Sequence, residues 1–253
     1  MSDTERDRES FVAPGEAADV FVSYAHEDRA FVVKVHQALR ERGRTAWVDW
    51  EGIPPSAEWM VEIENAIIRA QAYVFVVSPQ SASSAICVQE AGLAARHNKK
   101  VIPVVAEAVD PARLPPVVAA RQWIDAEPAR DFTAVIDALV SAIDTDLEWI
   151  SVHTRLLYQA VRWAADSEQI SLLQGHELEQ AEAWLDAADT HEAQPTPEQV
   201  TFVAASRWSQ WLAAALGWAT RTVARGASRP HRPRDRCSNS SQRTVRRQLL
   251  RGR

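Results

Sequence analysis

Five short runs rich in β-branched and aromatic residues recur along the first half of the chain, and a segment of helical periodicity separates each run from the next. The runs cover residues 19–24, 45–50, 73–78, 100–105 and, more weakly, 121–126. Strands that are apolar on both faces and alternate with helices are typical of a parallel sheet with helices on each side. The sequence therefore predicts an α/β fold for this region.

The first two intervening segments each carry one apolar face, as expected of helices that pack on a sheet. Ser56 is the predicted N-cap of the second helix, because a serine hydroxyl can accept a bond from an unpaired amide of the first turn. The residues that share the apolar faces are Phe31, Val32, Val35 and Leu39 in the first segment and Trp59, Ile63, Ile67 and Ala70 in the second.

Beyond residue 144 no further strand run occurs, and apolar residues recur at helical spacing in three stretches. Breaks are predicted at residues 166–175 and 190–199, where Pro195 and Pro197 suit a loop and the start of a new helix. The last stretch has 13 uncharged residues between Arg207 and Arg221, fewer than the ~20 of a membrane span. It predicts a buried or partner-docking helix, with membrane contact as the second possibility.

Charge and cysteine content restrict the remaining classes. Residues 221–253 hold 11 of the 28 basic residues and one acidic residue, so this tail carries a net charge of +10 and too few apolar groups to fold alone. We expect it to be disordered, without a specific nucleic-acid partner. Cys87 and Cys237 match no disulfide framework and no zinc-ligand spacing. The charged N-terminus is unlike a signal peptide, which favours a cytoplasmic protein without membrane contact.

Candidate functional groups follow the strands, because parallel sheets bind ligands beside the carboxyl ends of their strands. Residues 23–28, 49–55 and the stretch leading to Glu90 would meet at this edge. The eight glycines form neither GxGxxG nor GxxxxGK[ST], and GxSxG is absent, which argues against dinucleotide, P-loop and serine hydrolase sites. The seven histidines show no metal-ligand spacing. What remains is one carboxylate, Glu90, with aromatic and hydroxyl neighbours.

Three segments resemble the Toll/interleukin-1 receptor (TIR) domain, in particular its bacterial branch. They are DVFVSYAHED at residues 19–28, WVDWEGIPPSAEWMVEIENAI at 47–67 and SPQSASSAICVQEAGLA at 78–94, and KVIPVV at 100–105 follows in the expected order. The resemblance covers residues 19–145 and implies a five-stranded, flavodoxin-like parallel sheet. Together with the helical and charge patterns described above, it predicts four regions: a disordered N-terminus (1–18), the TIR domain (19–145), a helical module (146–220) and the disordered tail (221–253).

Many TIR domains cleave the bond between nicotinamide and ribose in NAD+, and Glu90 matches the glutamate they require. A carboxylate there would stabilise an oxocarbenium-like ribosyl transition state, with no cofactor and no metal. The resemblance places Tyr24 and Trp50 beside the substrate and Ser84 and Cys87 in the pocket. The alternatives are a helix-dipole role for Glu90, simple burial for Cys87 and core or rim packing for Trp50.

One position departs from the family pattern, because Ile86 stands where the family has tryptophan four residues before the glutamate. Because that stacking surface is absent, we expect a lower rate of NAD+ cleavage or a shift of the product from cyclic to linear ADP-ribose.

The loop between the second strand and the second helix is rich in proline and aromatic residues. Ile53, Pro54 and Pro55 lie at its tip and are predicted to mediate self-association with other TIR domains. The helical stretch resembles linkers of bacterial TIR proteins that carry STAND-type or WD40 sensors, so an unknown sensor partner is expected. The resemblance implies an NAD+-cleaving enzyme of bacterial stress or antiphage signalling, activated by self-association. The alternative is a non-catalytic adaptor that binds other TIR domains.

Overall fold

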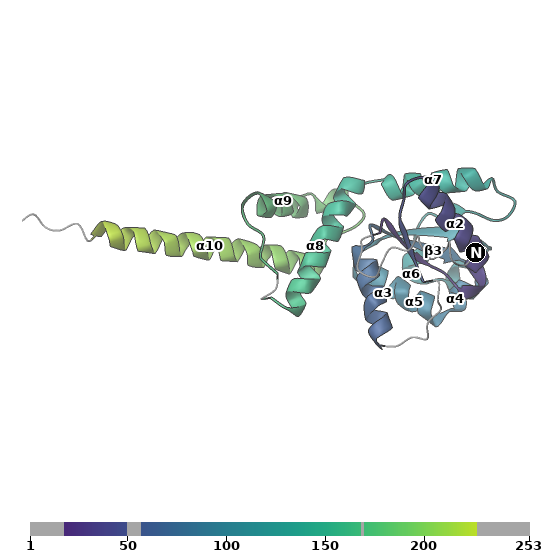
Figure 1. Cartoon of the computed structure of the whole chain (residues 1–253), viewed down its shortest axis with the longest axis horizontal. Helices are drawn as coiled ribbons and strands as arrows, with labels where there is room; N and C mark the ends of the chain where they lie inside the picture. The colour runs from purple at the N-terminus through teal and green to yellow at the C-terminus, as the bar shows by residue number, and fades with distance from the viewer. Residues whose placement is uncertain (1–17, 50–56, 168–169, 227–253) are drawn as a thin grey trace, which may run out of the picture. The chain divides into compact units, whose positions relative to one another are not determined.

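A single parallel sheet of five strands forms the centre of the N-terminal region. The computed structural model describes residues 18–49, 57–167 and 170–226 (Figure 1). The strand order is β2-β1-β3-β4-β5, and every neighbouring pair is parallel. The α/β prediction is therefore confirmed. The strands are β1 (Val20–Ser23), β2 (Ala46–Val48), β3 (Ala72–Val77), β4 (Lys100–Val105) and β5 (Ile124–Asp125).

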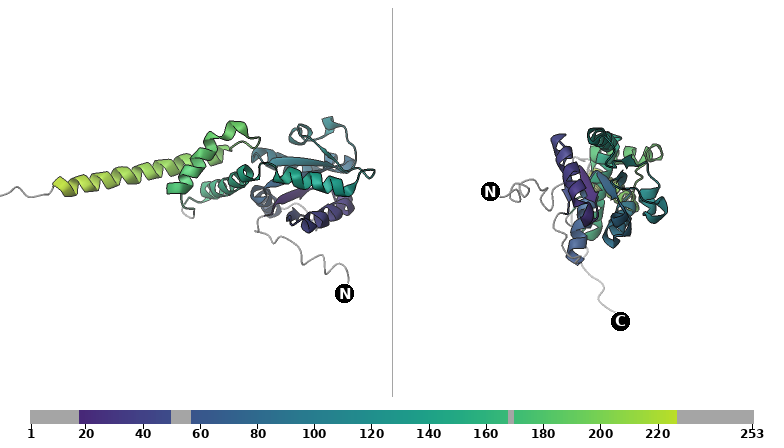
Figure 2. Two further views of the ribbon diagram at one scale, coloured as in Figure 1. Left: turned by 90° about the horizontal axis from the view of Figure 1, so that it is seen from above. Right: turned by 90° about the vertical axis from the view of Figure 1, so that its right-hand side faces the viewer.

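Helices cover both faces of this sheet. Successive strand residues point to opposite faces, so Phe21, Tyr73 and Phe75 enter one core while Val20, Val22 and Val74 enter the other. Helices α2 (Arg29–Glu41) and α7 (Phe132–Asp144) supply the second core, and α3 (Ala57–Arg69), α5 (Ala85–Arg96) and α6 (Pro116–Ala119) supply the first. Figure 1 shows these two layers, and Figure 2 gives two further directions.

The predicted apolar faces agree with the packing. Val32, Val35 and Leu39 are buried in α2, and Phe31 is half-buried against the same core. All four predicted residues of the second helix are buried, Trp59 among them, so its core role is confirmed. Ser56 and Trp50 lie outside the described residues. The fifth predicted strand, 121–126, shortens to two residues.

Three further helices follow the sheet region, as predicted. They are α8 (Leu147–Ala165), α9 (Gly175–Asp186) and α10 (Pro197–Gly226). At the start of α10 the Thr196 amide donates to Gln199 Oε1 at 2.6 Å, and the Gln199 amide donates to Thr196 Oγ1 at 3.3 Å, the reciprocal pattern of a capping box. Pro197 at the first helical position needs no amide partner. This helix therefore begins where the proline-rich break predicts.

Helix α10 continues past residue 220 to Gly226. Good helix formers such as Ala213, Ala214 and Ala215 occupy its interior, and its one glycine before the end, Gly217, does not break it. The chain divides into two compact units after Trp211. None of the helices in the described ranges has both the length and the apolar character that a membrane crossing needs. The predicted disordered segments are 1–18 and 221–253, and of these residues 1–17 and 227–253 lie outside the described residues.

Candidate functional site

Glu90 lies in the second turn of α5, and its carboxyl group is buried at the carboxyl end of the sheet. Its side chain is 5% exposed. The hydroxyl of Ser23, the last residue of β1, donates to Glu90 Oε2 at 2.5 Å. Ser23 pairs with Phe75 in the neighbouring strand β3, after which the chain leads into α5. The sheet topology therefore joins two polar groups that are 67 positions apart in the sequence.

The surroundings of Glu90 favour its neutral form. Burial raises the pKa of Glu90 to about 8, the Ser23 hydrogen bond opposes this rise, and the negative charge of Asp49 adds to it. The carboxyl group is thus protonated over part of the neutral range and ionises above it. Perturbed ionisable groups of this kind are concentrated at functional sites.

Tyr24 connects the ends of β1 and β2. Its phenol donates to the backbone carbonyl oxygen of Asp49 at 2.7 Å. Burial raises the pKa of Tyr24 to about 12; Arg29 opposes this rise, while Asp49 and Glu90 add to it. The phenol is therefore neutral at physiological pH, and Tyr24 flanks the same strand ends as Ser23.

Ser84 and Cys87 hold the start of α5. Ser84 is the N-cap residue, and its Oγ accepts a bond from the Cys87 amide at 3.3 Å. Cys87 is buried, and burial followed by the charge of Glu90 raises the pKa of its thiol to about 11. A thiol with so little thiolate is unreactive at neutral pH. The structure thus brings Cys87 near Glu90 as a packing residue.

Several serines before Glu90 serve helix capping. Ser78 and Ser81 form a capping box at the start of α4 (Pro79–Ser83), with amide-to-hydroxyl distances of 3.0 and 2.9 Å. The Ser78 hydroxyl also donates to Asp28 Oδ2 at 2.6 Å, which ties the end of β3 to the segment after β1. The serine-rich stretch therefore turns the chain sharply so that α5 starts beneath the strand ends.

The remaining predicted positions divide into two groups. Ile86 is half-buried against the core formed by α3, α5 and their strands. Trp50, Ile53, Pro54 and Pro55 fall outside the described residues. The main site residue that the sequence prediction missed is Ser23. Its only signal in the sequence is its place at the end of the first strand. Within the described ranges, no cluster of three histidine, cysteine or acidic side chains could hold a metal ion.

The comparison with known families agrees with this geometry, because residues 20–140 match the family model of the TIR domain. Residues 20–140 are a TIR domain. The region is similar to the TIR domain of the Toll-related receptor TRR-2 from Hydra magnipapillata, at 20% identity over 52% of this chain and 99% of that one, with a TM-score of 0.43. None of the curated proteins compared with the chain matches it.

Two further solved structures are similar to the TIR domain. The TIR domains of the activated Roq1 resistosome are 22% identical over 50% of this chain and 99% of that one, with a TM-score of 0.41. A metazoan TIR-STING receptor from C. gigas is 23% identical over 50% of this chain, with a TM-score of 0.40, and the match spans 39% of that receptor.

Proposed function

We propose that the TIR domain cleaves the nicotinamide–ribose bond of NAD+ with Glu90 as its required carboxylate. The observation that carries this proposal is the burial of the Glu90 carboxyl group at the carboxyl end of the sheet, where Ser23 holds it at 2.5 Å. A single oriented carboxyl group at the carboxyl ends of the strands suits stabilisation of a ribosyl cation. A solvated helix residue would need neither the burial nor the partner.

The reaction balances with one carboxylate. The carbon–nitrogen bond breaks, nicotinamide leaves as a neutral molecule with the bonding electron pair, and positive charge develops on the ribose. The ionised Glu90 stabilises this charge through space. Water then attacks the anomeric carbon and loses a proton, which gives ADP-ribose. Attack by a ring nitrogen of the adenine would instead give the cyclic product. A cationic leaving group needs no general acid, so one carboxylate suffices.

The pKa of Glu90 makes this proposal specific. With a pKa of about 8, much of the free protein at pH 7 carries the neutral acid. The positive nicotinamide ring of a bound NAD+ favours the ionised form, because an opposite charge nearby lowers a carboxyl pKa. Substrate binding is therefore coupled to loss of the Glu90 proton.

Other residues of this region are assigned supporting roles. Tyr24 flanks the substrate with a neutral ring whose hydroxyl is held by Asp49 at 2.7 Å. Ser84 and Cys87 fix the start of α5 and so the position of Glu90. Trp50 is proposed to flank the substrate from the loop that follows β2. The aromatic surface missing at Ile86 is expected to change the rate or the product.

Assembly completes the proposed site. The loop containing Ile53, Pro54 and Pro55 is proposed to dock on a second TIR domain and to activate cleavage. The biological setting that fits is bacterial stress or antiphage signalling in the cytoplasm, with a sensor partner still to be identified.

A second candidate function is that of a non-catalytic adaptor that binds other TIR domains. The observation that favours it is the combination of Ile86, which provides no ring to stack on a base, with a Glu90 side chain that is only 5% exposed. In an adaptor, Glu90 would serve the packing beneath the strand ends and NAD+ would not be consumed.

Incubation with NAD+ and measurement of released nicotinamide distinguishes the two functions. Wild type should release nicotinamide, and Glu90→Gln should release none, because the amide keeps the shape but loses the charge. Glu62→Gln is the matched control, since Glu62 is exposed on the neighbouring helix α3. No release by wild type would favour the adaptor, and equal release by wild type and Glu90→Gln would overturn the assignment of Glu90 as the required carboxylate.

A further inference from the structure

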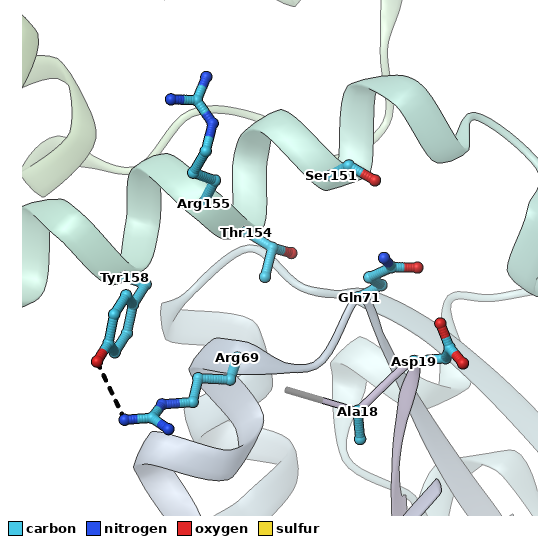
Figure 3. A pocket seen from close by; sticks show the side chains of 8 residues that line it. All are labelled: Ala18, Asp19, Arg69, Gln71, Ser151, Thr154, Arg155 and Tyr158. Carbon is cyan, nitrogen blue, oxygen red and sulfur yellow. Dashed lines mark hydrogen bonds between the residues drawn. The ribbon is translucent and has the colours of Figure 1, made fainter. Parts of the chain in front are cut away.

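A cavity lies at the end of the sheet opposite to Glu90. Its volume is about 410 Å³, and it lies between the TIR domain and α8 (Figure 3). Asp19 directly precedes β1, whereas Ser23 at the Glu90 site ends that strand. The cavity is therefore separate from the proposed NAD+ site. Its lining residues are Ala18, Asp19, Arg69, Gln71, Ser151, Thr154, Arg155 and Tyr158.

Cationic side chains border the cavity both from the TIR domain and from α8. Arg69, at the end of α3, donates to the Tyr158 hydroxyl at 3.1 Å, and its guanidinium lies 4.7 Å from the ring centre. Arg162 donates to the same hydroxyl at 2.9 Å. In Figure 3 Arg69 and Tyr158 point toward one another, and Arg155 extends from α8 away from them. Arg155 is exposed, so its long side chain has room to turn from this position toward an anion in the cavity.

The only carboxylate in the lining is already engaged. Asp19 Oδ2 accepts bonds from the Thr45 amide at 2.7 Å and from the Thr45 hydroxyl at 3.0 Å. These bonds orient the carboxylate without removing its charge, so Arg69 and Arg155 leave the lining with an excess of one positive charge. The balance favours an anionic ligand, and a guanidinium fork suits phosphate in particular.

A buried acceptor and an exposed hydroxyl complete the lining. Gln71 Oε1 is buried and finds no hydrogen-bond donor among the residues that the structure describes. A buried acceptor without a donor is costly, so a ligand hydroxyl that donates to it would be favoured. Ser151 is exposed on α8 and offers a hydroxyl, whereas the Thr154 hydroxyl already accepts from Lys99 Nζ at 3.0 Å.

We propose that this cavity binds a phosphorylated ribose. The phosphate is bound by Arg69, Arg155 and the Ser151 hydroxyl, and a ribose hydroxyl donates to Gln71 Oε1. The volume lies within the range of small-molecule sites. Because the ligand contacts the TIR domain and α8 at once, it stabilises their packing. This site is independent of the chemistry proposed for Glu90.

The test measures binding of ribose 5-phosphate to the full chain by calorimetry. The unfolding temperature of the chain is then measured with and without this ligand. We expect ribose 5-phosphate to bind and to raise the unfolding temperature, and ribose or inorganic phosphate alone to bind more weakly. Arg155→Gln should weaken binding about tenfold, because it removes one charge-assisted contact. Arg113→Gln, an exposed arginine outside the cavity, is the matched control and should bind as wild type does.

Three outcomes would overturn the proposal. One is the absence of any binding at millimolar ribose 5-phosphate. A second is equal binding of ribose and ribose 5-phosphate, which would remove the role of the arginines. The third is binding that survives both Arg155→Gln and Ser151→Ala but is lost in Glu90→Gln, which would assign the ligand to the other site. Both cavity substitutions are at exposed positions of α8, and circular dichroism verifies that the variants fold.

Discussion

The hydroxyl of Ser23 donates to Glu90 Oε2 at 2.5 Å, and this bond links the end of β1 to α5. It opposes the burial that raises the pKa of Glu90 to about 8. Burial, opposed by this hydrogen bond between distant residues, therefore sets how much of the carboxylate exists at neutral pH. The proposed chemistry depends on this fraction.

The first prediction concerns the pH dependence of NAD+ cleavage. The free protein needs ionised Glu90, so kcat/KM should rise with pH, with a midpoint near pH 8, and level off above it. Ser23→Ala removes the bond that favours ionisation and should move the midpoint up by about one pH unit. The measurement is nicotinamide release from pH 6 to 10. Ser83→Ala, at an exposed serine, should leave the midpoint unchanged; an unmoved midpoint in Ser23→Ala would refute the role of Ser23.

The second prediction concerns folding stability. The folded pKa of Glu90, about 8, lies above the ordinary value of 4.5, so between these values the folded chain binds more protons than the unfolded chain. The contribution of Glu90 to the free energy of unfolding is therefore most favourable below about pH 4.5 and is lost as pH rises through 8.

Glu90→Gln is neutral at every pH and should be more stable than wild type above pH 8, by on the order of 2–4 kcal/mol, with a smaller difference at pH 5. Urea unfolding at both pH values measures this. For the control Glu62→Gln, the difference from wild type in the free energy of unfolding should be small and equal at the two pH values. A Glu90→Gln effect that does not change with pH would contradict the raised pKa.

The third prediction concerns Ile86. Ile86→Trp should raise turnover or change the ratio of cyclic to linear ADP-ribose, because it supplies an aromatic stacking surface. The site is half-buried, so overpacking is expected to cost about 1–3 kcal/mol of stability. Chromatography of the reaction products measures both the turnover and the product ratio. Ile86→Leu is the control, because it changes the shape of the side chain without adding an aromatic ring. Identical rates and products in all three proteins would make this position purely structural.

The fourth prediction concerns activation by assembly. Cleavage per molecule should rise with protein concentration, and Ile53→Asp should abolish that rise, because a buried unpaired charge weakens a contact by a few kcal/mol. Val33→Asp is the control, since Val33 is an exposed apolar residue on α2, 42% accessible to solvent. Rates measured alongside light scattering test this. A dilute monomer as active as the concentrated protein would show that one chain holds a complete site.

The sequence by itself determined the arrangement of secondary structure and the family. Strand runs and apolar helix faces are local signals, because they involve neighbours within a few positions. The three boxes identified the TIR resemblance for the same reason, and residues 20–140 match that family. The domain boundaries and the roles of the site residues remain predictions.

Only the tertiary structure decided what surrounds those residues. Glu90 meets Ser23 because the strand order places β1 beside β3, and its protonation depends on burial by side chains from several elements. The cavity between Gln71 and Ser151 likewise exists because α8 packs near the start of the sheet. Burial and long-range contacts arise from the whole fold, and no local pattern in the sequence encodes them.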